Sequence, residues 1–471
     1  MRRTRILRDR RRPQKIFFLC AHPRKQPDRR PNAFLRVRTE TETQRGWDGS
    51  ASLYLGFAPA ISARRSSFPL GSSARQTCAR TAAQLFFATA RTDLLARAAH
   101  HHAEMKGIYR CWAEIDRSAL RHNAKIVRER VGSAEVLAVV KANAYGHGLM
   151  GVAETLACEA QLFGVANLEE ALALRESFSH PIILLGPTLP GERSTIAERG
   201  FIPTISALKE AQDFNRVALR SPVPINLKID TGMGRMGVPE DQALGVLKKI
   251  SAFANIRILS ISTHLPVAGE DADYTRDELL RFGEIMKQFR AAVPIDYKAH
   301  VLQSAGVLAF AEPAGAFDMV RAGIILYGIS PLPGFQKLLK PAMTWKTRIS
   351  LVRDIPKGSS ISYGRTFITP REMRIATLSA GYADGYPWHL SNRDAAVLVR
   401  GRRCPILGRV TMDLMMIDVS DLDHAQVGDE VVLMGRDGNE EISCAELAKA
   451  AGTIPWEITT RIGARVRRVY V

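Results

Sequence analysis

The stretch "VLAVVKANAYGHGLMGVAETLACEAQLFGV", residues 136–165, decides the fold class. It opens with an apolar, β-branched run, continues with helix-type apolar spacing at 148–160, and returns to a strand-like run at 162–167. A strand, a helix and a second strand within about 30 residues are typical of a βαβ unit, whose two strands are parallel. Lys141 stands between the first strand and the helix, which places an amine at the mouth of an apolar core.

The same alternation continues along the chain to about residue 328. Helix-type spacing recurs at 206–219, 239–254 and 273–293. The strand-like runs are VLAVVK (136–141), LFGVAN (162–167), IILLG (182–186), FIPTIS (201–206), INLKID (225–230), ILSISTH (258–264), YKAHVLQS (297–304) and VRAGIILYG (320–328). Eight strand-then-helix repeats predict a closed parallel (β/α)8 barrel of the TIM type, with a doubly wound open sheet as the alternative.

The pattern changes after "YGISPLPGF", residues 327–335. Short strand-like runs separated by glycine turns follow, and one helix-like segment, "CAELAKAAG", interrupts them late in the chain. We therefore predict a barrel domain at 105–337 and an all-β domain at 338–471.

Residues 1–104 differ from the rest, because they are rich in Arg, Ser and Pro and show no sustained period. They carry +14 of the formal net charge of +19. Three explanations compete: a disordered extension, a targeting peptide, or a start codon placed too far upstream. We favour the last, with translation beginning near Met105, and exclude the segment from the fold argument. The remaining chain is close to neutral, so its charge does not favour a nucleic-acid partner.

The six cysteines are scattered, without a CxxC pair or a metal-ligand spacing. Reduced thiols, a cytoplasmic location and no bound metal are the expectation. No apolar run approaches the roughly 20 residues of a membrane helix, so we expect no membrane partner.

Polar side chains recur at the predicted carboxyl ends of the barrel strands. They are Lys141, Lys228, Asp230, Arg235, His264, Ser304 and Arg321. Each alone has an ordinary interpretation, such as a solvated rim charge, but in a barrel all of them meet at one rim, where active sites form. A desolvated lysine can lose its proton and react with an aldehyde, and pyridoxal 5'-phosphate (PLP) is the usual aldehyde in this role. Hydroxyls of Tyr145 and Ser304 and the backbone at 322–324 are candidate phosphate donors.

Several motifs together resemble the alanine racemase family of fold-type III PLP enzymes. They are "AVVKANAYGHG", "LKIDTGMGRMG", "VRAGIILYGISP", "ISYGRTF", "GYADGYP" and "GRVTMDLMMIDVS". The resemblance runs from about Arg110 to Tyr470, and it implies a barrel followed by a β domain. It also implies interconversion of L- and D-alanine in the cytoplasm to supply peptidoglycan, by a homodimer with shared active sites.

The resemblance implies two catalytic bases. Lys141 would carry PLP and act on one face of the substrate, and Tyr363, in "ISYG", would act on the opposite face from the second subunit. Two bases on opposite faces suit racemisation, since one removes the α-proton and the other returns it with inverted configuration. Tyrosine has an ordinary pKa near 10, so it needs help from neighbouring donors or charge, implied here to be His264 and Arg321.

Further roles follow from the resemblance. Arg321 would donate to the pyridine nitrogen, and Arg235 would bind the substrate carboxylate with its fork of donors. Lys228 would orient Arg235, as an Nζ-carbamate in one interpretation. Met412 and Asp413 would reach the site from the partner subunit, and Tyr382 would lie near the substrate entrance. The implied cofactor-binding residues are Lys141, Tyr145, His264, Ser304, Arg321, Gly323, Ile324 and Trp456.

Three positions depart from the family pattern. Trp456 stands in "IPWE" where the family has a tyrosine, Gln303 replaces an asparagine, and Gly269 occupies a place where an acidic residue is often found at the entrance. Indole donates through its N–H but is bulkier than a phenol and lacks an acceptor. The alternative function is therefore a racemase of serine or another small amino acid on the same scaffold.

Overall fold

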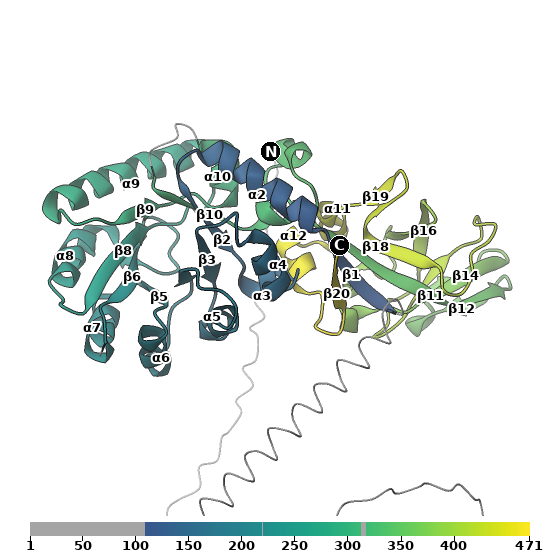
Figure 1. Ribbon diagram of the computed structural model, residues 1–471. Helices are drawn as coiled ribbons and strands as arrows, with labels where there is room; N and C mark the ends of the chain where they lie inside the picture. The colour runs from purple at the N-terminus through teal and green to yellow at the C-terminus, as the bar shows by residue number, and fades with distance from the viewer. Residues whose placement is uncertain (1–108, 219, 312–316) are drawn as a thin grey trace, which may run out of the picture. The chain divides into compact units, whose positions relative to one another are not determined.

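The computed structural model describes residues 109–218, 220–311 and 317–471 of the 471-residue chain (Figure 1). The three explanations for residues 1–104 concern a segment outside these described residues. The elements below keep the labels of Figure 1.

Within the described residues, eight parallel strands form a closed barrel. Their bounds are β2 Glu135–Val139, β3 Leu162–Val165, β4 Ile182–Leu184, β5 Ile202–Ile205, β6 Val223–Asp230, β8 Ile256–Ser262, β9 Lys298–His300 and β10 Met319–Ala322. They pair in the order β5-β4-β3-β2-β10-β9-β8-β6, and β5 also pairs with β6, in parallel, through Thr204 and Asn226. The predicted barrel is confirmed, because this last pairing closes the sheet and excludes the open one.

Helices surround the sheet (Figure 1); α2 precedes the first barrel strand, and the others follow barrel strands. They are α2 Arg117–Val131, α4 Leu149–Leu156, α5 Leu168–Arg175, α6 Arg193–Glu198, α7 Leu208–Val217, α8 Glu240–Ser251, α9 Ala272–Ala292 and α10 Ser304–Phe310. Side chains at the preceding residues fix several starts: Asp116 accepts from the backbone of α2, Asn167 from α5 and Asp271 from α9. Such N-caps each contribute about 1 kcal/mol by satisfying N–H groups that the first turn leaves free.

The second sheet is antiparallel apart from its last pair. Its order is β19-β18-β15-β16-β17-β14-β11-β1-β20. The strands are β1 Cys111–Ile115, β11 Met343–Ile355, β14 Met373–Leu378, β15 Ala396–Val399, β16 Arg402–Leu407, β17 Met415–Asp418, β18 Glu430–Asp437, β19 Glu440–Ile442 and β20 Arg467–Tyr470. A hairpin of β12 (Ser360–Ile361) and β13 (Phe367–Ile368) stands apart.

Two features differ from expectation: one concerns the division into 105–337 and 338–471, and the other is an additional helix. Strand β1 belongs to the second sheet, where it pairs with β11 and, in parallel, with β20. Helix α11 (Cys444–Ala451) corresponds to the expected helix, but α12 (Pro455–Thr460) was not expected. We keep 105–337 and 338–471 as a proposed division, with β1 assigned to the second sheet.

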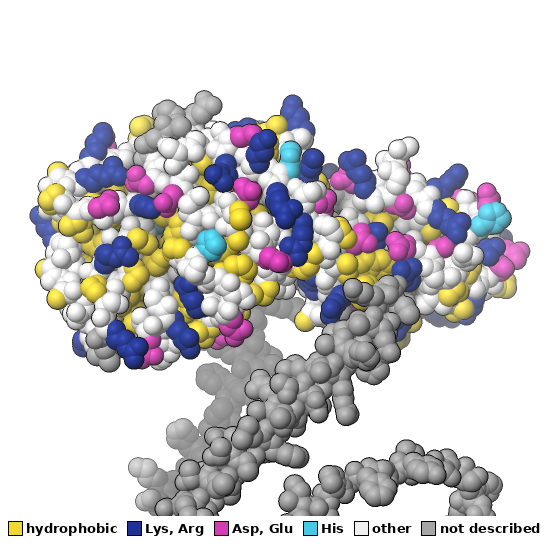
Figure 2. Space-filling model, viewed as in Figure 1, with side chains coloured by type: hydrophobic (Ala, Val, Ile, Leu, Met, Phe, Trp, Pro, Cys, Tyr) yellow, Lys and Arg dark blue, Asp and Glu magenta, His cyan; other side chains and the backbone are white. Residues whose placement is uncertain are grey.

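Figure 2 shows Lys and Arg side chains interspersed with Asp and Glu over the face in view. Of the helices that the structure describes, none combines the length and apolar composition that a membrane crossing needs.

Candidate active site

A pocket of about 590 Å³ opens at the carboxyl ends of the barrel strands. Val139 of β2, Arg321 of β10 and residues just beyond β8 and β9 lie in its wall. The predicted site residues that line it are Lys141, Tyr145, Arg235, His264, Ser304, Arg321, Gly323, Ile324 and Trp456. The pocket therefore brings together groups that lie up to 315 positions apart in the sequence, from Lys141 to Trp456.

Lys141 does not end a strand, contrary to expectation. Strand β2 stops at Val139, and Lys141 opens the short element α3 (Lys141–Tyr145). Residues 142–145 have φ between 51° and 55°, which is the left-handed region although none of them is glycine. This conformation costs roughly 1–2 kcal/mol per residue and persists where the surroundings enforce it, as they often do at functional sites.

The turn is held by hydrogen bonds on both sides. Leu149 N–H donates to Asn143 Oδ1 at 2.8 Å, and Arg468 donates to the Gly146 carbonyl at 2.8 Å. A Cβ on Gly146, whose φ is 83°, would lie 2.0 Å from the Thr459 carbonyl oxygen. Only glycine fits this close approach, so the turn and helix α12 are locked together.

The Lys141 amine is prepared to lose its proton. Burial lowers its pKa from the usual 10.5, the nearby Arg235 guanidinium lowers it further, and Glu170 opposes the shift. A lowered lysine pKa increases the neutral, nucleophilic fraction of the amine, which is the form that attacks an aldehyde.

Tyr145, Ser304 and Gly323 form a cradle that fits a phosphate. Gly323 N–H donates to Ser304 Oγ at 3.0 Å, and a Cβ on Gly323 would lie 2.6 Å from Tyr145 Oη. Burial raises the pKa of Tyr145 to about 12, so its hydroxyl stays protonated and can donate. Two hydroxyls and backbone N–H groups near a reactive lysine match the donor set that a phosphorylated aldehyde needs.

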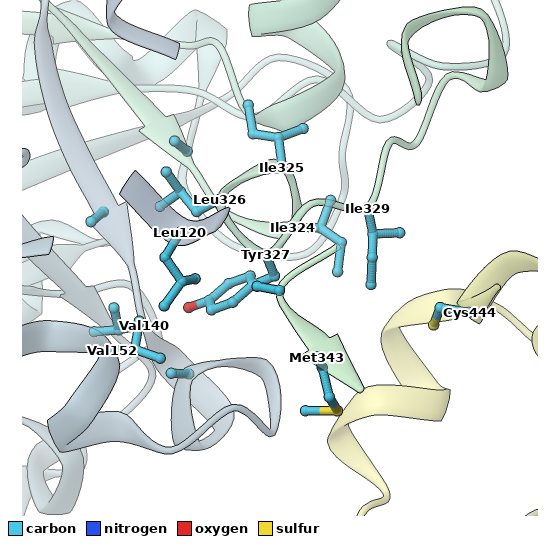
Figure 3. Close-up of a cluster of buried hydrophobic side chains, with 14 of the residues drawn as sticks. Leu120, Val140, Val152, Ile324, Ile325, Leu326, Tyr327, Ile329, Met343 and Cys444 are labelled. Atoms are coloured by element: carbon cyan, nitrogen blue, oxygen red, sulfur yellow. The ribbon is translucent and has the colours of Figure 1, made fainter. Parts of the chain in front are cut away.

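A buried aromatic group supports this cradle from below. Figure 3 shows the Tyr327 ring among Leu120, Val140 and Ile324. The ring centroid of Tyr327 lies 5.0 Å from that of Tyr145, and its hydroxyl donates to the Val139 carbonyl at 2.9 Å. The end of β2 and the Tyr145 ring are thus fixed by one side chain.

Arg321 joins two histidines beneath the pocket. Its Nη2 lies 3.2 Å from His264 Nδ1, and its Nη1 lies 2.7 Å from His300 Nδ1. Burial lowers the Arg321 pKa to about 10, so it stays a cation at neutral pH. Burial and the Arg321 charge lower the pKa of His264 to about 2, so this imidazole is neutral. Because arginine can only donate, His264 Nδ1 accepts and its proton resides on Nε2.

Sequence reasoning missed the network behind Arg321. His300 Nε2 lies 3.0 Å from Asn226 Oδ1, which also accepts from Ser260 Oγ, while Asn226 Nδ2 donates to Thr204 Oγ1. Since Arg321 donates to His300 Nδ1, Nε2 carries the proton and donates to Asn226. A single histidine in a strand is usually a core residue, so no sequence signal separated it from that interpretation.

The pocket is rich in positive groups that need anions. Lys228 is buried, and burial together with Arg321 holds its pKa well below the usual range. It lines a cavity of about 70 Å³ that Lys141, Arg235 and Arg321 share. Among the described residues Arg235 forms no ion pair, which leaves its fork free for an anion. Anionic ligands, for instance a phosphate and a carboxylate, would be bound favourably by the positive groups that remain.

The turn that carries Arg235 is anchored by helix α9, a feature that the sequence did not reveal. Thr231 Oγ1 lies 2.6 Å from Thr263 Oγ1 and donates to Glu278 Oε1 at 2.5 Å. Arg281 donates to the Thr231 carbonyl at 2.5 Å. One helix therefore fixes the starts of two rim segments, those of Arg235 and His264.

Five predicted site residues lie outside this pocket: Lys228, which lines the smaller cavity, and four residues of the second domain. Tyr363, Tyr382 and Met412 are 71%, 41% and 54% exposed, and Asp413 is also exposed, all within the second domain. Tyr363 sits in a turn in which Ser362 and Arg365, neither of them glycine, have φ of 64° and 51°. Within one described chain, the second predicted base does not line the lysine's pocket.

Trp456, Gln303 and Gly269, the three departures from the expected pattern, all line the pocket. Trp456 reaches the pocket from α12, as part of the same chain as Lys141. Gln303 also lines it, but its side chain is engaged as the cap of α10, where Oε1 accepts from Gly306 N–H at 2.7 Å.

The fold and the pocket together define a barrel enzyme built to hold a phosphorylated aldehyde on a lysine. Comparison with known proteins gives the family. Residues 115–331 match the family model described as alanine racemase, N-terminal domain, and residues 342–470 match alanine racemase, C-terminal domain. The chain belongs to the alanine racemase family of PLP-dependent isomerases.

Curated relatives and solved structures agree. An alanine racemase of Halothermothrix orenii is 43% identical over 370 residues, covering 76% of this chain and 96% of the relative. One of Methylacidiphilum infernorum is 40% identical, covering 77% and 92%. A solved alanine racemase of Bartonella henselae, with covalently bound pyridoxal phosphate, is 30% identical with a TM-score of 0.70, covering 77% of this chain and all of the other. One of Bacillus anthracis, with bound L-Ala-P, is 34% identical with a TM-score of 0.71, covering 77% and 96%.

Proposed function

We propose that the chain interconverts L-alanine and D-alanine with PLP, using Lys141 and Tyr363 as bases on opposite faces of the substrate. When bound, PLP supplies the electron-withdrawing group that makes the α-proton acidic. The observation that carries the proposal is the shared pocket: a lysine of lowered pKa lies beside a phosphate cradle and a free guanidinium.

Lys141 and the cradle divide the work on the cofactor side. Lys141 Nζ would hold the cofactor at rest and carry a proton to or from the α-carbon during turnover. Tyr145, Ser304 and the backbone of Gly323 and Ile324 would hold the phosphate, with Trp456 closing the pocket from α12. Arg321 would donate to the pyridine nitrogen, and since its pKa stays near 10 it would not pass a proton there.

Tyr363 would enter the pocket from a second copy of the chain. Its exposure in the single chain, on a turn of the other domain, supports this assignment. His264 is neutral, and its Nε2–H is the donor left over after Arg321 occupies Nδ1. The His264 Nε2–H, polarised by the buried Arg321 cation, would stabilise the Tyr363 phenolate. A more stable phenolate allows this tyrosine to act as a base.

The substrate carboxylate would be bound by Arg235 and by the Met412 backbone N–H of the second copy. Arg235 is unpaired among the described residues and offers two parallel donors. Lys228 would orient Arg235 from below, with or without a carbamate, while Asp413 and Tyr382 would complete the wall next to the entrance. A homodimer with two shared sites follows from these assignments.

Subunit mixing tests the two-base assignment. Lys141→Ala alone should lose both racemisation and the absorbance of lysine-bound cofactor, and Tyr363→Phe alone should lose racemisation but keep the absorbance. Unfolding and refolding the two inactive variants together should restore activity, up to half of that of the wild type per hybrid dimer, since one site then has both bases. Inactive mixtures that contain hybrid dimers would rule out sharing of sites between subunits.

We place this enzyme in the cytoplasm, with D-alanine supplied to peptidoglycan as its role. The alternative, a racemase that prefers serine or another small amino acid, is not favoured, because the curated relatives are alanine racemases. A panel of L-amino acids, with exchange of the α-proton measured in heavy water, separates the two, and faster exchange of serine than of alanine would restore the alternative.

A further inference from the structure

Three turns of the second domain form one unit around Met412. They are 381–385, 411–413 and 461–465. Tyr382 N–H donates to the Thr411 carbonyl at 3.0 Å, and Ala383 N–H donates to the Met412 carbonyl at 2.9 Å. A Cβ on Gly381 would lie 2.3 Å from the Thr411 carbonyl oxygen, so the first two turns touch through backbone alone.

Arg465 connects all three turns. Its guanidinium donates from Nε to Asp384 Oδ1 at 2.7 Å and from Nη2 to Asp384 Oδ2 at 3.0 Å. Nη2 also donates to Asp413 Oδ1 at 2.7 Å. Asp384 is only 4% exposed and accepts in addition from Gly381 N–H at 2.9 Å. A bidentate pair with a buried carboxylate fixes both position and direction, which a lysine in the same place would not do.

The consequence falls on Met412, which precedes the ion-paired Asp413. The Met412 carbonyl accepts from Ala383 N–H, and the next residue, Asp413, accepts from Arg465. The Met412 N–H donates no hydrogen bond to any residue that the structure describes. A rigid turn with a free donor is preorganised to bind an anion without reordering at the moment of binding.

We propose that Arg465 is a positioning residue for the racemase reaction. Its pairs with Asp384 and Asp413 hold the Met412 turn so that the free N–H meets the substrate carboxylate in the site of the second copy. This role rests on the proposed function, since it requires a site shared between subunits.

Arg468, three residues later, provides a matched control. It donates to the Gly146 carbonyl at 2.8 Å, next to the left-handed turn after Lys141, and to the carbonyls of Ile462, Gly463 and Val466. Arg468 therefore supports the Lys141 half of the site in its own chain. Arg465 instead supports the Met412 turn, which would complete the site of the second copy.

The first experiment compares Arg465→Met with the wild type in the PLP-loaded enzyme. Loss of one well-placed donor to a carboxylate should raise KM for alanine about 10- to 100-fold, with a smaller change in kcat. The inhibition constant of propionate, which is alanine without its amino group, should rise by a similar factor. Arg465→Lys should fall between the two, because it keeps the charge but not the fork.

Subunit mixing assigns the effect to one half of the site. Hybrids of Arg465→Met with Lys141→Ala should show the wild-type KM, because the working lysine then faces an intact Met412 turn. Hybrids of Arg468→Lys with Lys141→Ala should keep whatever defect Arg468→Lys has alone. The Lys141→Ala and Tyr363→Phe mixture reports separately on whether sites are shared.

Clear outcomes would overturn the inference. An unchanged propionate constant in a folded Arg465→Met dimer would remove the positioning role. Failure of the Arg465→Met hybrid to regain the wild-type KM, while the Tyr363→Phe hybrid is active, would do the same and leave the proposed function intact. If Arg465→Met does not fold, Arg465→Lys carries the same two tests, and a wild-type propionate constant in it counts against the role.

Discussion

Replacing Gly323 by alanine tests the phosphate cradle directly. Gly323 has φ −116° and ψ −106°, a combination outside the α and β regions that alanine favours, so the substitution adds backbone strain to the contact of the new methyl group. That methyl would lie 2.6 Å from Tyr145 Oη and 3.5 Å from Ser304 Oγ. A separation of 2.6 Å is well inside van der Waals contact, so the tyrosine hydroxyl must move away from the cradle.

The expected magnitude follows from the bond that is lost. A hydrogen bond to a charged group contributes about 1.5–3 kcal/mol, which corresponds to roughly a 10- to 150-fold weaker affinity for PLP. Titration of the cofactor-free protein with PLP, followed by absorbance, measures this change. Calorimetric unfolding without PLP is the control, because it measures the backbone strain and the steric contact apart from the loss of PLP affinity.

A double-mutant cycle gives the prediction its sharpest form. Tyr145→Phe removes both the hydroxyl bond and the atom that the new methyl meets. Gly323→Ala should therefore lower the affinity for PLP less in a Tyr145→Phe background than in the wild type, giving a coupling of about 1.5–3 kcal/mol. Additive losses, or an unchanged PLP affinity in Gly323→Ala alone, would refute the cradle as described.

Two further changes test other parts of the structure. Burial lowers the pKa of His147 to about 4, so as the pH falls from 6.5 to 4 the unfolded chain binds a proton at this residue before the native chain does. His147 should lower the free energy of unfolding by roughly 3 kcal/mol over that range, in addition to the contribution of His264, whose pKa is also lowered. In denaturant titrations at several pH values, His147→Gln should remove its own share and make the dependence shallower. An equal slope in both proteins would show that other groups set the dependence. Trp456 lines the pocket from α12, so Trp456→Ala should raise kcat/KM for serine relative to alanine by about 10-fold or more. The magnitude follows because an apolar pocket discriminates by about 1–3 kcal/mol per methylene-sized change in the substrate. An unchanged ratio would show that other residues limit the size of the substrate.

The barrel was predictable because its signal is periodic and repeated. Most of the strands are buried on both faces and read as largely apolar runs, and helix-type spacing follows several of them, so independent repeats agreed. One sequence feature favoured the open sheet that was kept as the alternative, because Gly232–Gly237 reads GxGxxG directly after β6. Here the glycines shape the turn that carries Arg235, and the closing β5–β6 pair decides the topology.

The site was predictable as far as strand ends determine it. Lys141, Arg235, His264, Ser304 and Arg321 meet because parallel strands in a barrel end at one rim. The left-handed turn after Lys141 could not be foreseen, because residues 142–145 include no glycine and the conformation is enforced by contacts from elsewhere in the chain. The same holds for His300, Asn226 and Glu278, whose partners lie on other strands and helices, so that only the folded chain reveals them.

The position of β1 has a consequence for how the protein is made. This strand lies between β11 and β20, and it pairs in parallel with residues 467–470. During synthesis β1 leaves the ribosome early, yet both of its neighbours emerge more than 200 residues later. The barrel strands, complete by residue 322, can associate while translation continues, whereas the second sheet must wait for its final strand. A ribosome-bound nascent chain should therefore carry a folded barrel together with β1 as an unpaired apolar strand. Chaperones would bind this exposed strand until the second sheet forms.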